Sequence, residues 1–186
     1  PPVKDPDGSA YLIQTRINGS GAKVYGGTLE GKVAYKDKVQ LQAGLTLQRS
    51  IYDSPEEWSA DEEHLSEKER YSDKILRTPD VYGYFTATYM PVKAFSIALN
   101  GNYTGRMYVP HLLSEVNVKS PDFFELGTKI AYDFDFQGFC LQLNAGVQNI
   151  FNSYQKDFDK GASRDSGYIY GPGAPRSYFA GVKLSF

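Results

Sequence analysis

Apolar and polar residues alternate along much of this chain, with the period of two that a β-strand with one apolar face produces. The alternation is regular in five segments, at residues 39–48, 95–102, 125–136, 139–148 and 178–186. Two further segments, at about 11–35 and 81–90, are less regular and are also interpreted as strands. The pattern therefore predicts seven β-strands in an all-β fold.

The connections between these segments alternate in length. Short turns are expected near residues 36–38, 91–93 and 137–138, and long connections at 53–78, 106–122 and 152–176. In an antiparallel up-and-down meander every second connection lies at the same end of the sheet. The sequence thus predicts one end with tight turns and one end with large loops, an asymmetry typical of outer-membrane β-barrels.

The composition of the 186 residues agrees with this fold and excludes several classes of protein. Fifteen Tyr and eleven Phe favour strands, and eighteen Gly and ten Pro favour turns. The net charge of −2 provides no electrostatic footprint for nucleic acid, so we expect no nucleic-acid partner. The single Cys excludes an intramolecular disulfide, and no apolar run approaches the roughly 18–20 residues of a membrane-spanning helix.

The two faces of the predicted strands differ in a way that favours a membrane barrel. The polar face of the strands at 39–48, 95–102 and 139–148 holds amides, hydroxyls and small residues but no charge. A surface open to water would carry about 25–35% charged residues, so this face suits a barrel lumen packed against protein. Aromatic residues gather near the short turns, as a membrane-interface girdle would: Tyr35, Tyr89, Phe95, Tyr132, Phe134, Phe136, Phe139 and Phe186. The core of a soluble β-sandwich is the alternative interpretation of the same aromatics.

Three stretches resemble a known family. In the first, Asn18, Ala22 and Gly26 match a family pattern, while Ser20 and Thr28 replace its Gly and Glu. The second stretch is 144–152, a strand that runs into an Asn-Ile-Phe-Asn end. The third is 175–186, a closing strand with a Gly, alternating apolar positions and a terminal Phe, in which Phe179 departs from a preferred polar residue. Together the three stretches resemble the C-terminal part of TonB-dependent outer-membrane receptors.

This resemblance implies that residues 1–186 are the C-terminal arc of a 22-stranded transmembrane β-barrel, without the plug domain and the earlier strands. The expected location is the outer membrane of a diderm bacterium. The implied function is part of a TonB-energised importer for a scarce nutrient such as a siderophore, haem or cobalamin. The implied partners are outer-membrane lipid, the plug domain and TonB complex, a small metal-chelate or cobalamin-like ligand, and the barrel-assembly machinery. That machinery would read Gly181, Leu184 and Phe186.

Two alternatives stay open at this stage. The chain could be a complete small barrel of about eight strands, a size at which side chains fill the interior, that acts as an adhesin or a structural protein. It could also be a soluble β-barrel binding module. A closed sheet would favour the first alternative.

Candidate functional residues lie in the long connections. The segment 53–73 contains nine acids and two bases, and Ser59 with Glu62 fits a capping box that opens a helix at about 60–71. Aromatic and polar side chains at the long-loop end are candidates for ligand contacts: Trp58, His64, Tyr108, His111, Arg164, Tyr168 and Tyr170.

The segment 157–168 is a weak match to a calcium-binding loop. Asp157, Asp159 and Asp165 supply carboxylates, but Gly161 comes one place early and Tyr168 stands where a bidentate Glu belongs. An ordinary polar loop is the alternative, and calcium is the one cofactor considered for this chain. The sequence contains no nucleophile–base arrangement, phosphate-binding Gly loop or metalloprotease motif, so we expect that it is not an enzyme.

Overall fold

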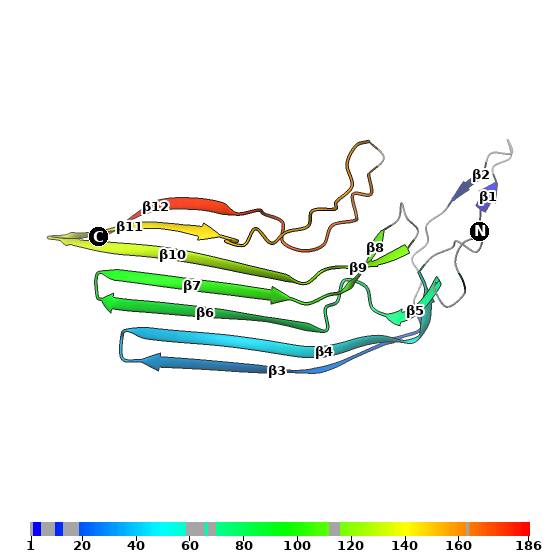
Figure 1. Cartoon of the computed structure of the whole chain (residues 1–186), viewed down its shortest axis with the longest axis horizontal. Coiled ribbons are helices and arrows are strands. Elements are labelled where there is room, and N and C mark those ends of the chain that lie inside the picture. The colour runs from blue at the N-terminus through cyan, green and yellow to red at the C-terminus, as the bar shows by residue number, and fades with distance from the viewer. Residues whose placement is uncertain are drawn as a thin grey trace.

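A computed structural model of the protein describes residues 2–4, 10–12, 19–58, 66, 70–111, 116–162 and 164–186. Seven long strands form one antiparallel sheet, in the order β12-β11-β10-β7-β6-β4-β3 (Figure 1). Their bounds are β3 (Ala22–Tyr35), β4 (Val39–Glu57), β6 (Val81–Val92), β7 (Phe95–Thr104), β10 (Phe123–Phe136), β11 (Phe139–Gln148) and β12 (Ser177–Ser185). Neighbours in the sheet are also neighbours among these seven strands along the chain, so the predicted all-β antiparallel meander of seven strands is confirmed.

The short elements lie at the long-loop end of the sheet (Figure 1). Strand β5 (Tyr71–Lys74) pairs with the far end of β4, and β8 (Tyr108–His111) forms a hairpin with β9 (Val116–Lys119) inside the long connection from β7 to β10. Strands β1 (Pro2–Lys4) and β2 (Ala10–Leu12) form a separate two-stranded sheet. Within the described residues no helix is long and apolar enough to cross a membrane.

One predicted boundary differs from the structure, and one predicted helix lies mostly outside the described residues. The single strand expected at 11–35 is wrong in its first part, because β3 begins only at Ala22 and residues 10–12 pair with β1 instead. Gly21 precedes β3 with a φ of 95°, a left-handed conformation that breaks an extended strand. Most of the helix expected at 60–71, with Ser59 and Glu62, lies outside the described residues, as does Asn18. The amide of Arg70 donates to the carbonyl of Ser66 at 3.1 Å, the spacing of one helical turn.

The register of the sheet aligns the apolar positions of all seven strands on one face. Leu41 lies opposite Val33 on β3 and opposite Ala87 on β6, and Ile97 lies opposite Ile130. Since directly opposed residues point to the same side of a sheet, these pairs extend one apolar surface across the strands. The alternation in the sequence therefore sorts into two faces, and the register between β6 and β7 shifts only beside their short turn, between Tyr89 and Val92.

The opposite face is polar, and two of its charged residues, Glu30 and Asp133, have hydrogen-bond partners on neighbouring strands. The hydroxyl of Tyr84 donates to Oε1 of Glu30 at 3.0 Å and accepts from Nε2 of Gln42 at 3.2 Å. On the same face, at the β10–β11 pair, Nε2 of Gln142 donates to Oδ1 of Asp133 at 2.7 Å. Cross-strand amide and hydroxyl bonds of this kind hold these two carboxylates on a face that also carries Lys32, Lys129 and Lys183.

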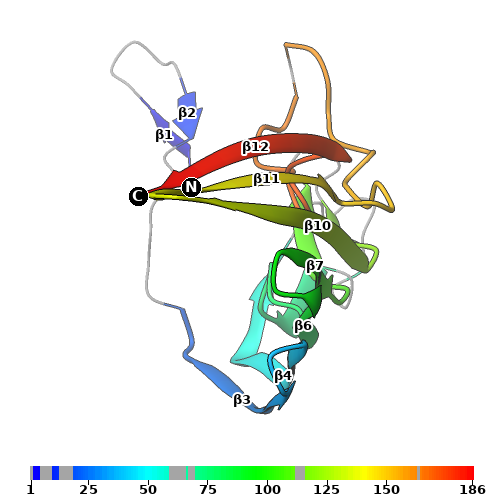
Figure 2. The ribbon, with the colours of Figure 1, turned by 90° about the vertical axis from the view of Figure 1, so that its left-hand side faces the viewer.

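The sheet is open: its two outer strands do not meet. Strand β3 pairs with β4 and β12 with β11, and these two outer strands are not paired with each other in the described part of the chain. Figure 2 shows the sheet curving from β12 round to β3 without closing. The closed small barrel considered from the sequence is therefore not formed by this chain.

The exposed area confirms that the sheet lacks a covering layer. The accessible surface is 13407 Å², whereas a compact protein of 20.8 kDa exposes roughly 9,000 Å². Among the described residues only Val109, Phe123, Ala131, Tyr168 and Tyr170 are buried hydrophobics. Leu45 on the apolar face is 47% exposed and Val182 is 67% exposed. The apolar face is thus a surface that needs lipid or protein against it.

We expect that the chain is not a water-soluble monomer. At about 25 cal/mol per Å², leaving about 1,000 Å² of apolar face in water forgoes on the order of 25 kcal/mol of burial. This exceeds the roughly 5–15 kcal/mol by which a typical domain is stable. Size-exclusion chromatography with light scattering, in the absence of detergent, checks the expectation. A monodisperse species near 20.8 kDa would contradict it.

A close contact on the apolar face gives a second prediction. Gly101 on β7 lies opposite Phe85 on β6, and a methyl group at position 101 would overlap the Phe85 ring. We expect Gly101→Ala to lower the free energy of unfolding in detergent by about 1–3 kcal/mol, because the ring must leave its position. Gly31→Ala is the matched control, since a methyl group on that glycine meets nothing within 4 Å. Equal stability of the two variants by urea titration and circular dichroism would refute this packing.

Candidate functional site

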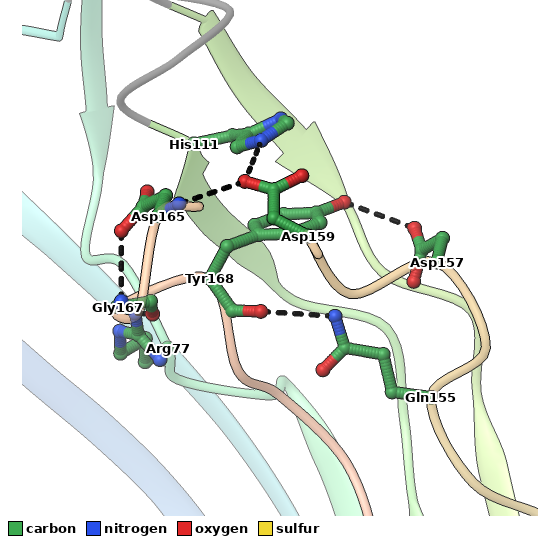
Figure 3. Close-up of polar contacts among 8 residues, drawn as sticks. All are labelled: Arg77, His111, Gln155, Asp157, Asp159, Asp165, Gly167 and Tyr168. Carbon is green, nitrogen blue, oxygen red and sulfur yellow. Dashed lines mark hydrogen bonds and ion pairs between the residues drawn. The ribbon is translucent and has the colours of Figure 1, made fainter. Parts of the chain in front are cut away.

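The connection from β11 to β12 packs against the β8–β9 hairpin at the long-loop end. Their contact contains the one buried hydrophobic cluster found among the described residues, formed by Val109, Phe123, Tyr168 and Tyr170. Met107 and Val118 pack against it. We call His111, Gln155, Asp157, Asp159, Tyr168 and Tyr170 the loop cluster, most of which is drawn in Figure 3.

Two asparagines fix the base of this connection. Asn149 and Asn152 have φ values of 50° and 56°, a left-handed conformation that Asn tolerates better than most residues. Oδ1 of Asn149 accepts from the amide of Ser153 at 2.8 Å, and its Nδ2 donates to the carbonyl of Ala174 at 2.9 Å. Oδ1 of Asn152 accepts from the amide of Arg176 at 2.9 Å. The Asn-Ile-Phe-Asn end noted in the sequence therefore ties the start of the connection to its end.

Asp157 is held between two tyrosine hydroxyls. Tyr170 donates to Oδ1 at 2.6 Å and Tyr168 donates to Oδ2 at 3.0 Å. Burial alone would raise the pKa of Asp157, but the hydrogen bonds from Tyr170 and Tyr168 lower it below its ordinary value. Burial, followed by the hydrogen bond to Asp157, raises the pKa of the Tyr170 hydroxyl above its ordinary value. The three groups therefore favour a carboxylate flanked by two neutral phenols.

His111 joins the hairpin to the loop. Its ring stacks on Tyr168 with the centroids 3.9 Å apart, and Nε2 lies 3.0 Å from Oδ2 of Asp159. The same carboxylate oxygen accepts from the amide of Asp165 at 3.1 Å. His111 and Asp159 are both largely buried, so this contact is more shielded from water than a surface ion pair.

Two side chains that the sequence analysis did not predict provide hydrogen-bond partners for the backbone of the loop. Gln155 is buried, and it donates to the carbonyl of Tyr168 at 3.0 Å and accepts from the amide of Tyr170 at 2.9 Å. Arg77 donates from Nη1 to the carbonyl of Ile169 at 2.6 Å and from Nη2 to that of Gly167. No motif marks either residue, because their partners are backbone groups that any sequence provides.

The other sequence candidates lie apart from this cluster. Trp58 packs on Tyr108 with ring centroids 5.1 Å apart, and Nζ of Lys119 lies 5.8 Å from the Tyr108 centroid. Arg164 is exposed and donates to the carbonyl of Gly161 at 3.1 Å. His64 lies outside the described residues.

The three aspartates proposed for calcium have donors on their oxygens. Besides the bonds to Asp157 and Asp159, Oδ1 of Asp165 accepts from the amide of Gly167 at 2.7 Å. Among the described residues no group of three or more His, Cys, Asp and Glu is arranged to hold a metal ion. Calcium binding by this loop stays a prediction.

The residues expected to form the assembly signal lie on or beside the outer strand β12. Gly181 lies opposite Asn144, whose Oδ1 would be 3.2 Å from a Cβ at position 181. Leu184 lies opposite Leu141, and Phe186 follows the strand with almost its whole surface exposed. Recognition of these residues by the barrel-assembly machinery stays a prediction.

A groove beside the loop cluster could receive a small molecule. It has a volume of about 650 Å³, within the range of small-molecule sites. Its aromatic and acidic lining includes Phe123, Phe124, Tyr154, Asp157 and Tyr170. Rings of this kind hold flat apolar groups, and Asp157 can accept a hydrogen bond at the edge.

Solved structures with a similar fold were identified, and one of them is described below. No family model and no curated protein matches this chain. The crystal structure of the ferric-catecholate import receptor Fiu from E. coli K12, in its closed form, aligns with 98% of this chain at a TM-score of 0.62 and 18% sequence identity. The aligned chain spans 23% of the length of that receptor. At this identity the similarity shows the fold, that of a part of a receptor barrel.

The hydrogen bond from Tyr170 to Asp157 gives a testable prediction about how the loop is held in place. We expect Tyr170→Phe to lower the hydrogen-exchange protection of residues 155–170, because loss of the hydroxyl removes a charge-assisted bond of about 1.5–3 kcal/mol. Tyr178→Phe is the matched control, since Tyr178 is 73% exposed on β12. Equal protection of the loop in both variants would show that this bond does not order it.

The same measurement has a defined pH dependence. The folded-state pKa of Asp157 lies below its ordinary value of 3.8. The ionised carboxylate therefore stabilises the folded loop fully above that value, and this stabilisation is lost as the pH falls through the folded-state pKa. In Tyr170→Phe the loss should begin at a higher pH, because one of the bonds that lowers the pKa is absent.

Proposed function

We propose that this chain forms part of the barrel wall of a TonB-energised outer-membrane importer for a scarce nutrient. The observation that carries the proposal is the alignment of 98% of the chain with the fold of an import receptor. The continuous apolar face supports the proposal, and so do the two outer strands, each of which has one unpaired edge. Both features suit a segment of a larger membrane barrel. In this proposal residues 1–186 are the C-terminal arc of a 22-stranded barrel in the outer membrane of a diderm bacterium.

The proposed substrate is a small iron chelate, with haem and cobalamin as the other members of the same class of cargo. The similar receptor is described as a ferric-catecholate importer, which favours the chelate. The aromatic groove of about 650 Å³ at the long-loop end is where this chain would contact the cargo. Trp58, Tyr108, His111 and Arg164 lie at the same end and would contribute further contacts.

The remaining partners follow from the same proposal. The polar face, with its paired charges and amides, would meet the plug domain inside the barrel, and the TonB complex would act through that domain. The apolar face would meet outer-membrane lipid, and β12 with its terminal Phe186 would be read by the barrel-assembly machinery. The proposed role is transport and involves no catalytic step by this chain.

Uptake assays test the function directly. Cells that lack the protein should lose TonB-dependent uptake of one of three labelled cargoes: a ferric tris-catecholate, haem or cobalamin. Re-expression of the protein should restore uptake, and collapse of the proton gradient should abolish it. Unchanged uptake of all three cargoes in the deletion strain would overturn the proposal.

A further inference from the structure

A second pocket lies where the hydrogen-bond ladder of the sheet is interrupted. Strand β4 pairs with β6 as far as Leu47 and Val81, and it pairs with β5 at Ile51 and Lys74. Gln48 still bonds to the carbonyls of Asp80 and Pro79, so the interruption is confined to the next two residues of β4, and a pocket of about 550 Å³ adjoins it. Arg49 and Ser50 line the pocket from β4.

The pocket is cationic. Four basic side chains from separate segments line it, together with two acids: Arg49, Lys74, Arg106 and Lys119 with Asp80 and Asp122. Nε of Arg106 lies 3.6 Å from Oδ1 of Asp122, and Nζ of Lys74 lies 3.8 Å from Oδ1 of Asp73. Arg49 has no ion-pair partner among the described residues. The lining therefore attracts an anion that the protein itself does not supply.

An unsatisfied hydroxyl also points to a ligand. Ser50 is 4% exposed, and its Oγ has no hydrogen-bond partner in the described part of the chain. A buried hydroxyl without a partner costs free energy, and a ligand oxygen that accepted from it would remove this cost. The pocket thus combines cationic groups with a buried donor, the pair of features that recognises a phosphate group.

The register places the cationic groups at the border of the apolar face. Arg49 lies two residues beyond Leu47 on β4, and Lys74 lies opposite Ile51, so both belong to the apolar side of the sheet. Tyr103, which also lines the pocket, lies opposite Gly83 on the same side. Cations at the edge of a lipid-facing surface lie at the depth of lipid headgroups. This step rests on the proposed membrane location of the chain.

We propose that this pocket binds the phosphate group of a lipid headgroup in the leaflet at the long-loop end. Arg49 and Lys74 contact the phosphate oxygens from the apolar side, and Ser50, which alternates with Arg49 and so lies on the polar side of β4, donates a hydrogen bond through the interruption in the ladder. The volume of the pocket exceeds that of a phosphate group and leaves room for the part of the headgroup that carries it. The site shares Asp122 with the groove proposed for the imported cargo, but Arg49, Ser50 and Lys74 line this pocket and not the groove.

Native mass spectrometry of the protein, purified in detergent, tests this site. The probes are phosphatidic acid, phosphatidylcholine and inorganic phosphate. We expect phosphatidic acid to bind preferentially, and the double variant Arg49→Gln, Lys74→Gln to weaken that binding about 10- to 30-fold, since each cation near a headgroup contributes about 1 kcal/mol. Ser50→Ala should weaken it several-fold.

The matched control removes two charges from the opposite end of the sheet. Lys38→Gln with Lys93→Gln should bind phosphatidic acid as the unaltered protein does, and circular dichroism should show both double variants folded. If both double variants lost phosphatidic acid binding equally, the site would be overturned. If both bound phosphatidic acid as tightly as the unaltered protein, the site would be overturned as well. Binding of inorganic phosphate as tightly as the lipid would assign the pocket to a soluble anion instead. Extraction of the protein from membranes without detergent would overturn the membrane proposal itself, whereas the other outcomes leave that proposal standing.

Discussion

Backbone hydrogen bonding in register across seven strands is the interaction on which every other feature of this molecule depends. Because the side-chain period of a strand is two, a slip of one residue between any two strands would move an apolar row to the polar face. The observed pairs avoid this from β3 to β12, as Leu41 opposite Val33 and Leu143 opposite Val182 show. The result is an apolar face that no described element covers, and this face needs lipid or protein against it.

The strands could be predicted from the sequence because their pattern is local. Five segments alternate so regularly that residue type alone assigns each side chain to a face, and the register then follows from the short turns. The start of β3 was missed because residues 18–21 were included in the strand, although Asn-Gly-Ser-Gly has no apolar side chain and Gly21 takes a left-handed conformation. The open edges were also beyond local pattern, since strand alternation is the same in a closed barrel and in an arc.

The loop cluster could be predicted only in part. His111 and Tyr168 were singled out because aromatic and polar side chains at a long-loop end suit a binding site, and Asp157 was singled out as a candidate calcium ligand. Their mutual contacts could not be read from the sequence, because His111 and Asp159 are 48 residues apart. Arg77 acts on backbone carbonyls of residues about 90 positions away, and such partners have no residue-type signature.

The two ends of the sheet satisfy their backbone groups by different means, and this difference bears on how the protein can vary. In the inner strands the backbone amides are paired with neighbouring strands, so a change in one strand affects the register of the next. In the connection from β11 to β12, side chains take that role, as Asn149, Gln155 and Arg77 each bond to backbone groups of the loop. The loop also has its own buried cluster around Tyr168 and Phe123, so its order does not depend on what covers the apolar face. Ligand contacts can therefore change at the long-loop end while the sheet below keeps its register.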